Sequence, residues 1–495
     1  MADLAQLCID ITERYSLIVA SNRGPVEYRS AENGELIPRH TSGGVVNAFG
    51  ALPTGTDFTW VSSALGEADR RALGTDGMSK ISHPMPQFSG GIRFVKPSRR
   101  VYHKYYNIIC NPLLWFLHHY MWNTPYSPNI DSTVHDAWAS GYRQVNESFV
   151  SEIVDEIDNS PKSPLVMLHD YHLYLCSGRL RDLRPDVVIQ HYIHVPWPEA
   201  RYWNLLPSEI ITEILVSLCK SDVVGFQTSS DSRNFLATIE LSDLAATIDW
   251  KDQSVTIDGH RCNVKVYPMG INTAEVMAIS QSRRVLERQT SLLELSSEIA
   301  VVRIDRAEPS KNVVRSLKAY EILLRDHEEL RTRVTFLAFI VPSRSHIRQY
   351  QRYVEEIHQE INRINTTYQT SGWTPVLAFV ENNYLQAVAA MTFYDVLLVN
   401  TITEGTNLIA LEGPIVNQRD GVTVLSTTSG VYPRLKEGVI SVSPTDLQGT
   451  SEAIAQAIAL SPPQKEAKQR LLRDVIERTS LANWLSDQFT DLLNI

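Results

Sequence analysis

Residues 163–198 have the sequence SPLVMLHDYHLYLCSGRLRDLRPDVVIQHYIHVPWP, and this stretch decides the fold. The apolar runs Leu165–Leu168 and Val187–Ile193 have the length and the β-branched content of buried strands. A stretch of helical character lies between them. We therefore expect a strand, a helix and a second, parallel strand, which is the repeating unit of a parallel α/β sheet.

The same alternation runs along the whole chain and restarts near residue 270. It predicts an α/β protein of two doubly wound domains that meet there. The expected strands are Ser16–Ser21, Phe58–Ser62, Gly91–Val95, Leu165–Leu168, Val187–Ile193 and Asp222–Phe226 in the first half, and Asn263–Tyr267, Ile299–Ile304, Val334–Val341, Pro375–Val380, Asp395–Asn400, Val422–Ser426 and Val439–Val442 in the second. The expected helices include Tyr102–Met121, Asn146–Ile157, Val313–Leu330, His346–Asn365 and a final one from about Pro463 to Ile495, interrupted near Ser480–Asn483.

The composition is that of a globular protein with an acidic balance. The 495 residues include 46 Lys and Arg against 56 Asp and Glu, which gives a net charge of −10. That average field repels nucleic acid and acidic membrane surfaces, so neither is an expected partner. Five dispersed cysteines predict reduced thiols, and no secretion signal or membrane-spanning run is evident. A cytoplasmic location is predicted, while the oligomeric state stays open, a homodimer included.

Several common catalytic motifs are missing from the sequence. Neither a GxGxxG fingerprint nor a Walker loop occurs, and there is no GxSxG elbow. These gaps disfavour hydride transfer, ATP hydrolysis and serine hydrolysis. The sequence also lacks Asp-x-Asp, which argues against a nucleotide-sugar site bridged by a metal. We therefore expect neither a metal nor another cofactor.

Polar residues follow the first strand and open the next helix. Arg23 comes directly after the strand, and Ser42-Gly43-Gly44 precedes a helical stretch. An arginine at a strand end and a glycine pair at a helix N-terminus together suit a phosphate. An exposed arginine in a turn and a glycine-rich cap would have the same sequence, so the spacing leaves both interpretations open.

Asp170 and His194 follow two neighbouring predicted strands. Because the carboxyl ends of parallel strands meet at one edge of a sheet, we expect the two side chains to face one cleft. A carboxylate and an imidazole there can bind hydroxyl groups or move a proton. A solvated aspartate and a core histidine are the alternative, and the equivalent topological positions favour function.

Cations follow strands of the second half in the same way. Arg306 and Lys311 lie in the loop after Ile299–Ile304, and Arg344 follows the next strand. Such a set suits a diphosphate whose negative charge grows as it leaves. Any one of these side chains alone is more often solvated.

The segment 403–408 follows Asp395–Asn400 and is expected to start a helix, with Glu412 further along. Backbone N–H groups at such a helix start can hold a diphosphate, and Glu412 can accept hydrogen bonds from a ribose diol. An N-capped helix with a surface glutamate is the alternative. Trp60, Tyr106 and Trp115 are suited to line a sugar pocket, although such aromatic residues more often belong to a core.

Together these segments closely resemble the trehalose-6-phosphate synthase family, which are retaining glycosyltransferases of the GT-B fold. The matching motifs cover nearly the whole chain: SNR with GG, YYN followed by LW, AWxxGYxxVN, HDYHL, HxPxP, DVVGFQT, VYPMGI, PSR, GWTP and EGTNLIALE. The resemblance implies two Rossmann-like domains facing a cleft. Residues 1–270 would bind the acceptor, residues 271–479 would bind the nucleotide donor, and the last helix, 480–495, would pack back on the first domain.

The resemblance also implies roles for individual residues, position by position. Asp170 and His194 would contact the transferred ring, and Arg306 and Lys311 would bind the leaving diphosphate. The phosphorylated acceptor would be held by Arg23, Trp60, Tyr106, Trp115 and Arg344. The donor would be bound by Gly44, Glu404, Gly405, Thr406, Asn407 and Leu408, with Glu412 on the ribose. The family is metal-independent.

The chain departs from the family pattern at two places. The family sequence R-L-D-Y-x-K-G is replaced by residues 306–312, RAEPSKN, which keep both cations. The family's Asp in D-G-M-N-L, which should touch the donor ring, is replaced by Glu404. One extra methylene moves the carboxylate by about 1.5 Å and disturbs recognition of glucose. The leaving-group residues therefore persist while the ring-reading residues change.

This combination resembles the pseudoglycosyltransferase branch of the family. It implies coupling of GDP-valienol, a nucleotide-linked unsaturated cyclitol, to validamine 7-phosphate through a C–N bond. Two alternatives stay open: trehalose-phosphate synthesis from nucleotide-glucose and glucose 6-phosphate, and a non-catalytic sugar-phosphate sensor. Retention of Arg306, Lys311, Asp170 and His194 weighs against the sensor.

Overall fold

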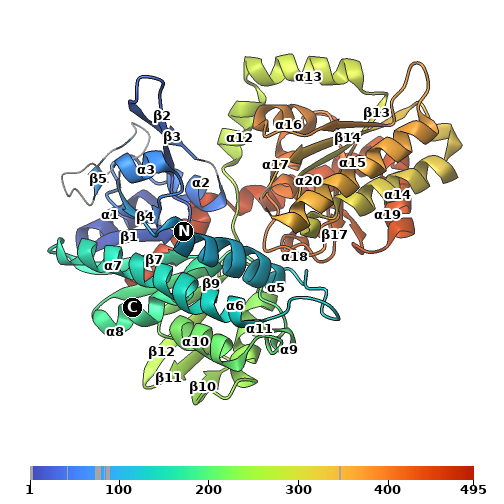
Figure 1. Cartoon of the computed structure of the whole chain (residues 1–495). Coiled ribbons are helices and arrows are strands. Elements are labelled where there is room, and N and C mark those ends of the chain that lie inside the picture. The colour runs from blue at the N-terminus through green and yellow to red at the C-terminus, as the bar shows by residue number, and fades with distance from the viewer. Residues whose placement is uncertain (1–3, 42, 73–79, 83, 85–89, 345–346) are drawn as a thin grey trace. The chain divides into compact units, whose positions relative to one another are not determined.

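The chain forms two compact units, each with its own sheet (Figure 1). The structure is a computed structural model and describes residues 4–41, 43–72, 80–82, 84, 90–344 and 347–495. Unit 1 comprises Met1–Pro268 and Leu481–Ile495, and unit 2 comprises Met269–Ser480. Ser42, named above as part of a phosphate-binding turn, lies outside the described residues.

Unit 1 contains a ten-stranded mixed sheet in the order β10-β11-β12-β9-β8-β7-β1-β4-β6-β5. The strands from β12 to β6 are parallel, whereas β10, β11 and β5 pair antiparallel at the two edges. A separate antiparallel hairpin joins β2 and β3. The strands are β1 (Tyr15–Ser21), β2 (Val26–Ser30), β3 (Leu36–His40), β4 (Thr59–Ser63), β5 (Ile81–Ser82), β6 (Gly91–Val95), β7 (Ser163–His169), β8 (Val188–Ile193), β9 (Val223–Phe226), β10 (Ala246–Asp249), β11 (Ser254–Ile257) and β12 (His260–Val266).

Helices connect these strands, and one long helical segment has π rather than α geometry. The α-helices of unit 1 are α1 (Leu4–Arg14), α2 (Gly44–Gly50), α3 (Glu67–Ala72), α4 (Arg99–Tyr102), α5 (Phe116–His118), α6 (Ser132–Ala137), α7 (Gln144–Asp158), α8 (Cys176–Leu183), α9 (Ala200–Trp203), α10 (Ser208–Cys219), α11 (Ser229–Glu240) and α21 (Leu481–Leu493). The π-helices are His103–Trp115 and Trp138–Arg143, and a 3₁₀ turn covers Tyr171–Leu173.

Unit 2 contains a six-stranded sheet in the order β15-β14-β13-β16-β17-β18, and all of its pairs are parallel. Its strands are β13 (Ile299–Arg306), β14 (Val334–Val341), β15 (Val376–Phe379), β16 (Val396–Val399), β17 (Val422–Ser426) and β18 (Ile440–Val442). Its helices are α12 (Thr273–Ser280), α13 (Arg283–Leu295), α14 (Val313–Asp326), α15 (Arg348–Tyr368), α16 (Tyr384–Met391), α17 (Ile409–Val416), α18 (Tyr432–Leu435), α19 (Leu447–Ala459) and α20 (Pro462–Arg478), with 3₁₀ turns at Pro309–Lys311 and Glu328–Leu330.

The sheet of unit 2 is buried on both faces. Along β13, Val302 and Ile304 enter one apolar core, whereas Ile299 and Val301 enter the other. Successive side chains of a strand point to opposite faces, and helices cover both faces of a parallel sheet, so the strand becomes a continuous apolar run. This arrangement is the physical reason why the strands were recognisable in the sequence, and the predicted α/β class is confirmed.

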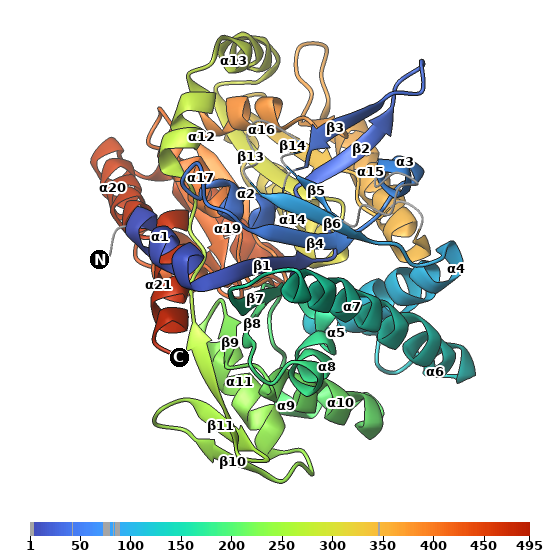
Figure 2. The ribbon, with the colours of Figure 1, turned by 90° about the vertical axis from the view of Figure 1, so that its left-hand side faces the viewer.

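The last helix of the chain belongs to unit 1 rather than to the unit that precedes it. α20 ends at Arg478, and α21 begins two residues after Thr479. Figure 2 shows α21 beside α1, and the two helices are in contact. Trp484, Leu485 and Phe489 of α21 are buried. Unit 2 is therefore an insertion between two parts of unit 1.

The structure corrects several sequence-based expectations. The strand expected at Asn263–Tyr267 in the second half is β12 of unit 1, at His260–Val266. The helix expected at Tyr102–Met121 is mostly the π-helix His103–Trp115. The hairpin β2–β3 and the edge strands β5, β10 and β11 were not predicted, because two to five residues with polar neighbours give no distinct period.

Candidate active site

Arg23 follows β1 and stands on a hydrogen-bonded support. Its side chain is exposed, whereas the preceding Asn22 is 7% exposed. The Asn22 Oδ1 atom accepts from the hydroxyl groups of Ser63 at 3.0 Å and Tyr105 at 3.3 Å, and its Nδ2 donates to the Tyr102 hydroxyl at 3.4 Å. These bonds tie the loop after β1 to β4 and to the π-helix, so Arg23 projects from a fixed backbone.

Trp60, which was predicted to line a sugar pocket, has a buried side chain. It is 1% exposed on β4, and its indole Nε1 donates to the Ser21 hydroxyl at 2.9 Å. Its ring packs edge-on against Phe49. Since Ser21 in turn donates to the Arg23 carbonyl at 2.8 Å, Trp60 supports the Arg23 loop from beneath.

Tyr106 lies in a stack of rings beside the end of β7. Its ring is stacked on Tyr102, with centroids 5.4 Å apart, and on His172, at 6.1 Å. The π-helix places Asn111 five residues later so that its Nδ2 donates to the Tyr106 carbonyl at 2.9 Å. Tyr106 is half-buried, so one part of it faces out of the stack.

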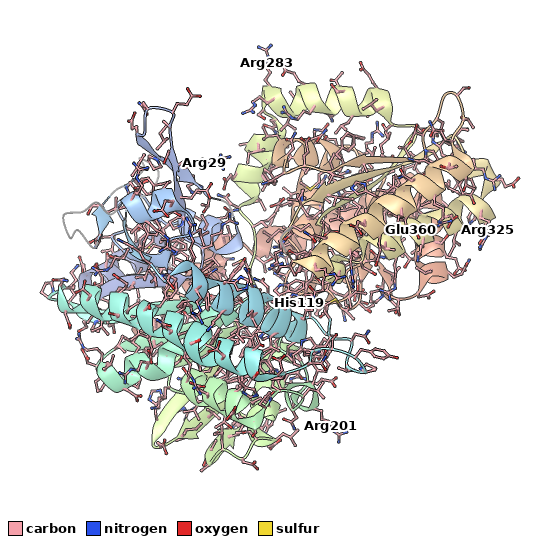
Figure 3. The ribbon with its side chains drawn as sticks, in the orientation of Figure 1. Arg29, His119, Arg201, Arg283, Arg325 and Glu360 are labelled. Atoms are coloured by element: carbon pink, nitrogen blue, oxygen red, sulfur yellow. The ribbon has the colours of Figure 1, made fainter. Side chains whose placement is uncertain are left out.

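Trp115 ends the same π-helix and is 3% exposed. Its ring stacks on His119, which is labelled in Figure 3, with centroids 4.0 Å apart. The His119 Nδ1–H donates to the Trp115 carbonyl at 2.8 Å. The structure thus fixes Trp115 rigidly, but with less exposed surface than a sugar-stacking residue would offer.

A pocket of about 410 Å³ opens beside Tyr102 in unit 1. Its lining residues are Ala64, Leu65, Gly66, Glu67, Arg70, Arg99, Tyr102, His103 and Asn107. Within this lining, Arg99 lies 3.5 Å from Glu67, and Arg70 donates to the Pro97 carbonyl at 2.7 Å.

Asp170 follows β7 in a strained backbone conformation. Its φ is 73°, a left-handed value that costs a non-glycine residue about 1–3 kcal/mol. Its amide donates to the Tyr192 carbonyl at 2.8 Å, and its own carbonyl accepts from His191 Nε2 at 3.1 Å. These bonds hold the conformation, and they leave the Asp170 carboxylate 21% exposed and 3.9 Å from His172 Nδ1.

His194 follows β8 and belongs to a cluster of three imidazoles. Its Nε2 lies 3.2 Å from Nδ1 of His169, which ends β7 and is fully buried. The third imidazole, His191, lies on β8. Burial lowers the pKa of all three histidines, and the neighbouring imidazoles lower that of His169 and His194 further. Burial thus favours the neutral form of all three imidazoles.

In unit 1 the predicted residues gather at one edge of the sheet. Arg23, Asp170 and His194 follow β1, β7 and β8, which are consecutive strands, and all three lie at carboxyl ends. Ligands of open α/β sheets bind at this edge. Gly44 begins α2, a helix of seven residues, after Gly43.

In unit 2 two predicted arginines share one carboxylate that sequence reasoning missed. Arg306 Nη1 lies 3.0 Å and Arg344 Nη1 lies 2.7 Å from the same Glu308 Oε1 atom. Glu308 is fully buried. Burial alone would raise its pKa, but the charges of Arg306 and Arg344 outweigh it and lower the pKa to about 2. The sequence feature that could have identified Glu308 is its position between the two predicted cations Arg306 and Lys311.

Lys311 is held by acidic groups of the same unit. Its Nζ lies 2.5 Å from Glu404 Oε2 and 3.8 Å from Asp305 Oδ1. Arg303, 1% exposed, pairs with Asp305 at 2.9 Å. Burial raises the pKa of Asp305 to about 6. The charges of Arg303 and Lys311 act in the opposite direction, whereas the charge of Glu404 raises the pKa further. The loop after β13 is therefore a compact ionic network.

The Glu404 carboxylate has protein donors on both oxygens. Oε1 accepts from Thr401 at 2.8 Å and Ser429 at 3.1 Å, and Oε2 accepts from Lys311 and, at 3.2 Å, from Asn407. Its side chain is 5% exposed. This carboxylate is thus fixed within the network.

The segment 405–408 precedes α17 rather than forming its start, because the helix begins at Ile409. Asn407 Oδ1 accepts from the Ala410 amide at 3.0 Å and so caps the first turn. Gly405 approaches the backbone of Gly430 so closely that a Cβ on Gly430 would lie 1.8 Å from the Gly405 carbonyl oxygen. Thr406 has a buried hydroxyl without a hydrogen-bond partner among the described residues, and Leu408 adjoins the helix.

Glu412 lies in α17 and is 8% exposed. Burial raises its pKa to about 7, against a hydrogen bond from Tyr384 and together with the charge of Glu275. Its Oε2 atom has no hydrogen-bond partner among the described residues. An acceptor that is buried and unsatisfied is suited to take a ligand hydroxyl.

The residues of unit 2 gather as those of unit 1 do. Arg306 is the last residue of β13, two residues beyond the predicted strand end, and Arg344 and Glu404 follow β14 and β16; these three strands are neighbours at the centre of the sheet. Within the described ranges, no group of three or more His, Cys, Asp or Glu residues has the geometry of a metal site. No helix of the described part of the chain is long and apolar enough to cross a membrane.

Comparison with known proteins agrees with this arrangement. The chain is 29% identical to validamine 7-phosphate valienyltransferase of Streptomyces hygroscopicus subsp. jinggangensis, over 96% of this chain and 94% of that protein. It is 30% identical to a bifunctional trehalose-6-phosphate synthase/phosphatase of Thermoproteus tenax, over 97% of this chain and 63% of that protein. The crystal structure of a UDP-forming alpha,alpha-trehalose-phosphate synthase from Burkholderia vietnamiensis shares the fold with a TM-score of 0.82, at 24% identity, covering 97% of this chain and 99% of that one. The model of glycosyltransferase family 20 matches residues 15–494, so the chain is a transferase enzyme and belongs to this family.

Proposed function

We propose that this enzyme couples GDP-valienol to validamine 7-phosphate through a C–N bond, giving validoxylamine A 7′-phosphate and GDP with retention. The observation that carries the proposal is the state of Glu404. A carboxylate that recognises glucose must offer its oxygens to ring hydroxyls, whereas the two oxygens of Glu404 already accept from four side chains. The similarity to a validamine 7-phosphate valienyltransferase supports the same choice.

The proposed chemistry needs charge stabilisation rather than a covalent nucleophile. The bond between the cyclitol carbon and the diphosphate oxygen breaks, and the ring alkene stabilises the allylic cation. The acceptor amine attacks from the same face, forms the C–N bond and gives its proton to an oxygen of the departing diphosphate. Arg306 and Lys311 offset the charge that grows on that diphosphate. Asp170 and His194 contact the transferred ring, His194 as a neutral imidazole.

The proposed contacts to the acceptor and to the rest of the donor come from residues near the strand ends of the two units. In unit 1, Arg23 and Tyr106 would hold the phosphorylated acceptor, with Trp115 as a rigid wall. In unit 2, Arg344 would contribute to the acceptor phosphate. Residues 405–408 and Gly44 would contact the donor, and Glu412 would accept hydrogen bonds from the ribose.

Trehalose-phosphate synthesis is the second candidate. The 30% identity to the Thermoproteus tenax enzyme favours it, as does the retained set of strand-end cations. Under this alternative, Glu404 would exchange a protein donor for a glucose hydroxyl when the donor binds.

A matrix of donors and acceptors separates the two candidates. The purified enzyme is incubated with GDP-valienol, GDP-glucose or UDP-glucose, each with validamine 7-phosphate or glucose 6-phosphate, and the products are identified by mass spectrometry. We expect product only from GDP-valienol with validamine 7-phosphate. Trehalose phosphate formed at a comparable rate would refute the cyclitol proposal. Glu404→Asp is the matched variant, and any gain in glucose transfer should appear there.

A further inference from the structure

Glu308 is a buried carboxylate that stands where the family sequence R-L-D-Y-x-K-G has Asp, and the proposed reaction gives it no role. It lies between β13 and the turn Pro309–Lys311 and is 0% exposed. Its amide donates to the Arg306 carbonyl at 2.7 Å, and its carbonyl accepts from the Lys311 amide at 2.9 Å. The backbone therefore fixes Glu308 between the two cations proposed to bind the leaving diphosphate.

Three donors converge on one oxygen of this carboxylate. Arg344 Nη1 lies at 2.7 Å, the Ser343 hydroxyl at 2.8 Å and Arg306 Nη1 at 3.0 Å from Oε1. The other oxygen, Oε2, is buried and has no hydrogen-bond partner among the described residues. Burying a carboxylate costs several kcal/mol unless it is paired. The arrangement holds two arginines at one point.

The two arginines differ in what they present to a ligand. The Arg306 side chain is 53% exposed, whereas that of Arg344 is 12% exposed. Arg344 is held further by Tyr350, whose hydroxyl accepts from Nη1 at 3.1 Å and whose ring lies 5.4 Å from the guanidinium carbon. A guanidinium has five N–H donors in a fixed fork, so anchoring one Nη1 sets the direction of the rest.

We propose that Glu308 is a positioning residue that fixes the guanidinium groups of Arg306 and Arg344 relative to each other. Its negative charge lowers the affinity of both arginines for phosphate, while its hydrogen bonds keep them oriented. The proposal rests on the proposed function, in which Arg306 binds the donor diphosphate and Arg344 the acceptor phosphate. The negative charge of Glu308 beside both cations lowers their attraction for phosphate oxygens. Guanidinium groups that are already oriented need no rearrangement while the diphosphate gains charge.

The test separates affinity from turnover in Glu308→Gln, which keeps the size of the side chain and removes its charge. We expect GDP to bind about tenfold tighter in titration calorimetry, with a steeper dependence on salt. We expect kcat to fall about a hundredfold, because misplacing groups by about 1 Å has that effect. A merely structural role would not raise affinity while lowering kcat.

Two variants complete the design. Glu308→Asp keeps the charge and shortens the side chain, so kcat should fall while GDP affinity stays within about twofold; it carries the test if Glu308→Gln does not fold. Glu298→Gln is the matched control. Glu298 directly precedes β13, is 63% exposed and pairs with Arg333 at 2.9 Å. The substitution removes one negative charge from unit 2, as Glu308→Gln does. It should leave kcat and GDP affinity unchanged.

The outcomes distinguish this inference from the proposed function. Folded Glu308→Gln with unchanged GDP affinity and kcat overturns the inference, as does a folded Glu308→Asp with unchanged kcat. The inference is also overturned if Glu308→Gln loses GDP affinity and kcat together, by the same factor as the fraction of folded protein. Wild-type enzyme that binds no nucleoside diphosphate would instead contradict the proposed function, since Glu308 then has no phosphate site to organise.

Discussion

Lys311 lies close to two carboxylates of the ionic network of unit 2. It contacts Glu404 at 2.5 Å and Asp305 at 3.8 Å, and its side chain is 14% exposed. In its proposed role, Lys311 stabilises the leaving diphosphate, so we expect replacement with alanine to lower kcat by about a hundredfold to a thousandfold. Single-turnover kinetics with the active donor and acceptor pair measures this change.

Lys318→Ala is the control for that experiment. Lys318 lies on α14 of the same unit, is 44% exposed and contacts Glu360 at 3.8 Å. Its removal should leave turnover within about twofold, because exposed ion pairs contribute little. Near-normal turnover in Lys311→Ala would contradict a role in departure of the diphosphate.

Glu412 gives donor binding a pH dependence whose sign can be worked out. Burial raises its pKa to about 7, and the groups that face it are Tyr384 and Glu275. In the proposed role, the ionised form accepts from ribose hydroxyls, and the protonated form predominates below pH 7. Donor affinity should therefore rise by about tenfold in total as the pH increases from 6 to 8.

The Glu412→Gln variant should lose this slope, because a neutral amide does not titrate. Titration of GDP at several pH values compares the two proteins. An unchanged slope in Glu412→Gln would assign the titration to another group and remove Glu412 from the ribose contact.

At single-residue resolution, the sequence located strand-end residues better than it described their partners. Asp170 and His194 follow strands that were recognisable as apolar runs, and parallel pairing then places them at one edge of the sheet of unit 1. Arg306 ends β13, a strand of unit 2 that was recognisable in the same way. Glu308 was missed because Ser343 and Arg344, which contact it, follow a different strand. The sequence left open whether Trp60 belongs to a core or lines a pocket, because an aromatic residue on a strand gives no sign of which face is covered.

Among the elements, β6 and α7 of unit 1 are joined by a buried ion cluster. Arg93 of β6 is 2% exposed and contacts Glu152 at 3.2 Å, Glu156 at 3.1 Å and also Asp155 of α7. Arg93→Met would leave Glu156, 9% exposed, with one cation fewer. We expect a loss of about 3–5 kcal/mol in the free energy of unfolding, because removing one partner strands a buried charge.

Chemical denaturation followed by circular dichroism measures this loss. Arg99→Met is the control, since Arg99 is 88% exposed and lies 3.5 Å from an exposed Glu67; its effect should stay within about 0.5 kcal/mol. Equal effects of the two variants would show that the Arg93 cluster contributes no more than a surface pair.

For the segment His103–Trp115, the sequence pattern predicted a helix but not its π geometry. Apolar residues with helical spacing predicted a helix there, and a helix exists. Periodicity alone does not separate a π from an α geometry over one turn, because packing against neighbours selects between them. The wider turn sets which residues reach the ring stack, so the position of Tyr106 was beyond prediction.

For the whole molecule, the chain crosses between the units twice, and the two crossings lie side by side within unit 2. Ile271 and Ser480 form a parallel bridge, and a Cβ on Gly270 would lie 1.8 Å from the Thr479 carbonyl oxygen. The last thirteen-residue helix, α21, thereby returns to unit 1. Unit 1 therefore includes a helix that follows unit 2 in the sequence.

Trp484 of α21 is the residue through which the contribution of this helix to unit 1 should be measurable. It is 1% exposed, and its ring packs against Tyr192 at 5.2 Å, His194 at 6.2 Å and His169 at 6.4 Å. Trp484→Ala should lower the free energy of unfolding of unit 1 by about 3–5 kcal/mol, as for other buried tryptophans. It should also raise the pKa of His194, because water would reach the imidazole cluster that burial now keeps neutral.

Thermal unfolding and the ¹⁵N chemical shifts of the histidines measure the two effects. Trp484→Phe should be milder, because the indole N–H has no hydrogen-bond partner among the described residues and phenylalanine keeps most of the packing. Trp250→Ala, an exposed tryptophan of unit 1 at 44% exposure, should change neither quantity. If Trp484→Ala lowers stability but leaves the titration of His194 unchanged, the last helix stabilises unit 1 without setting the charge state of its strand-end histidine.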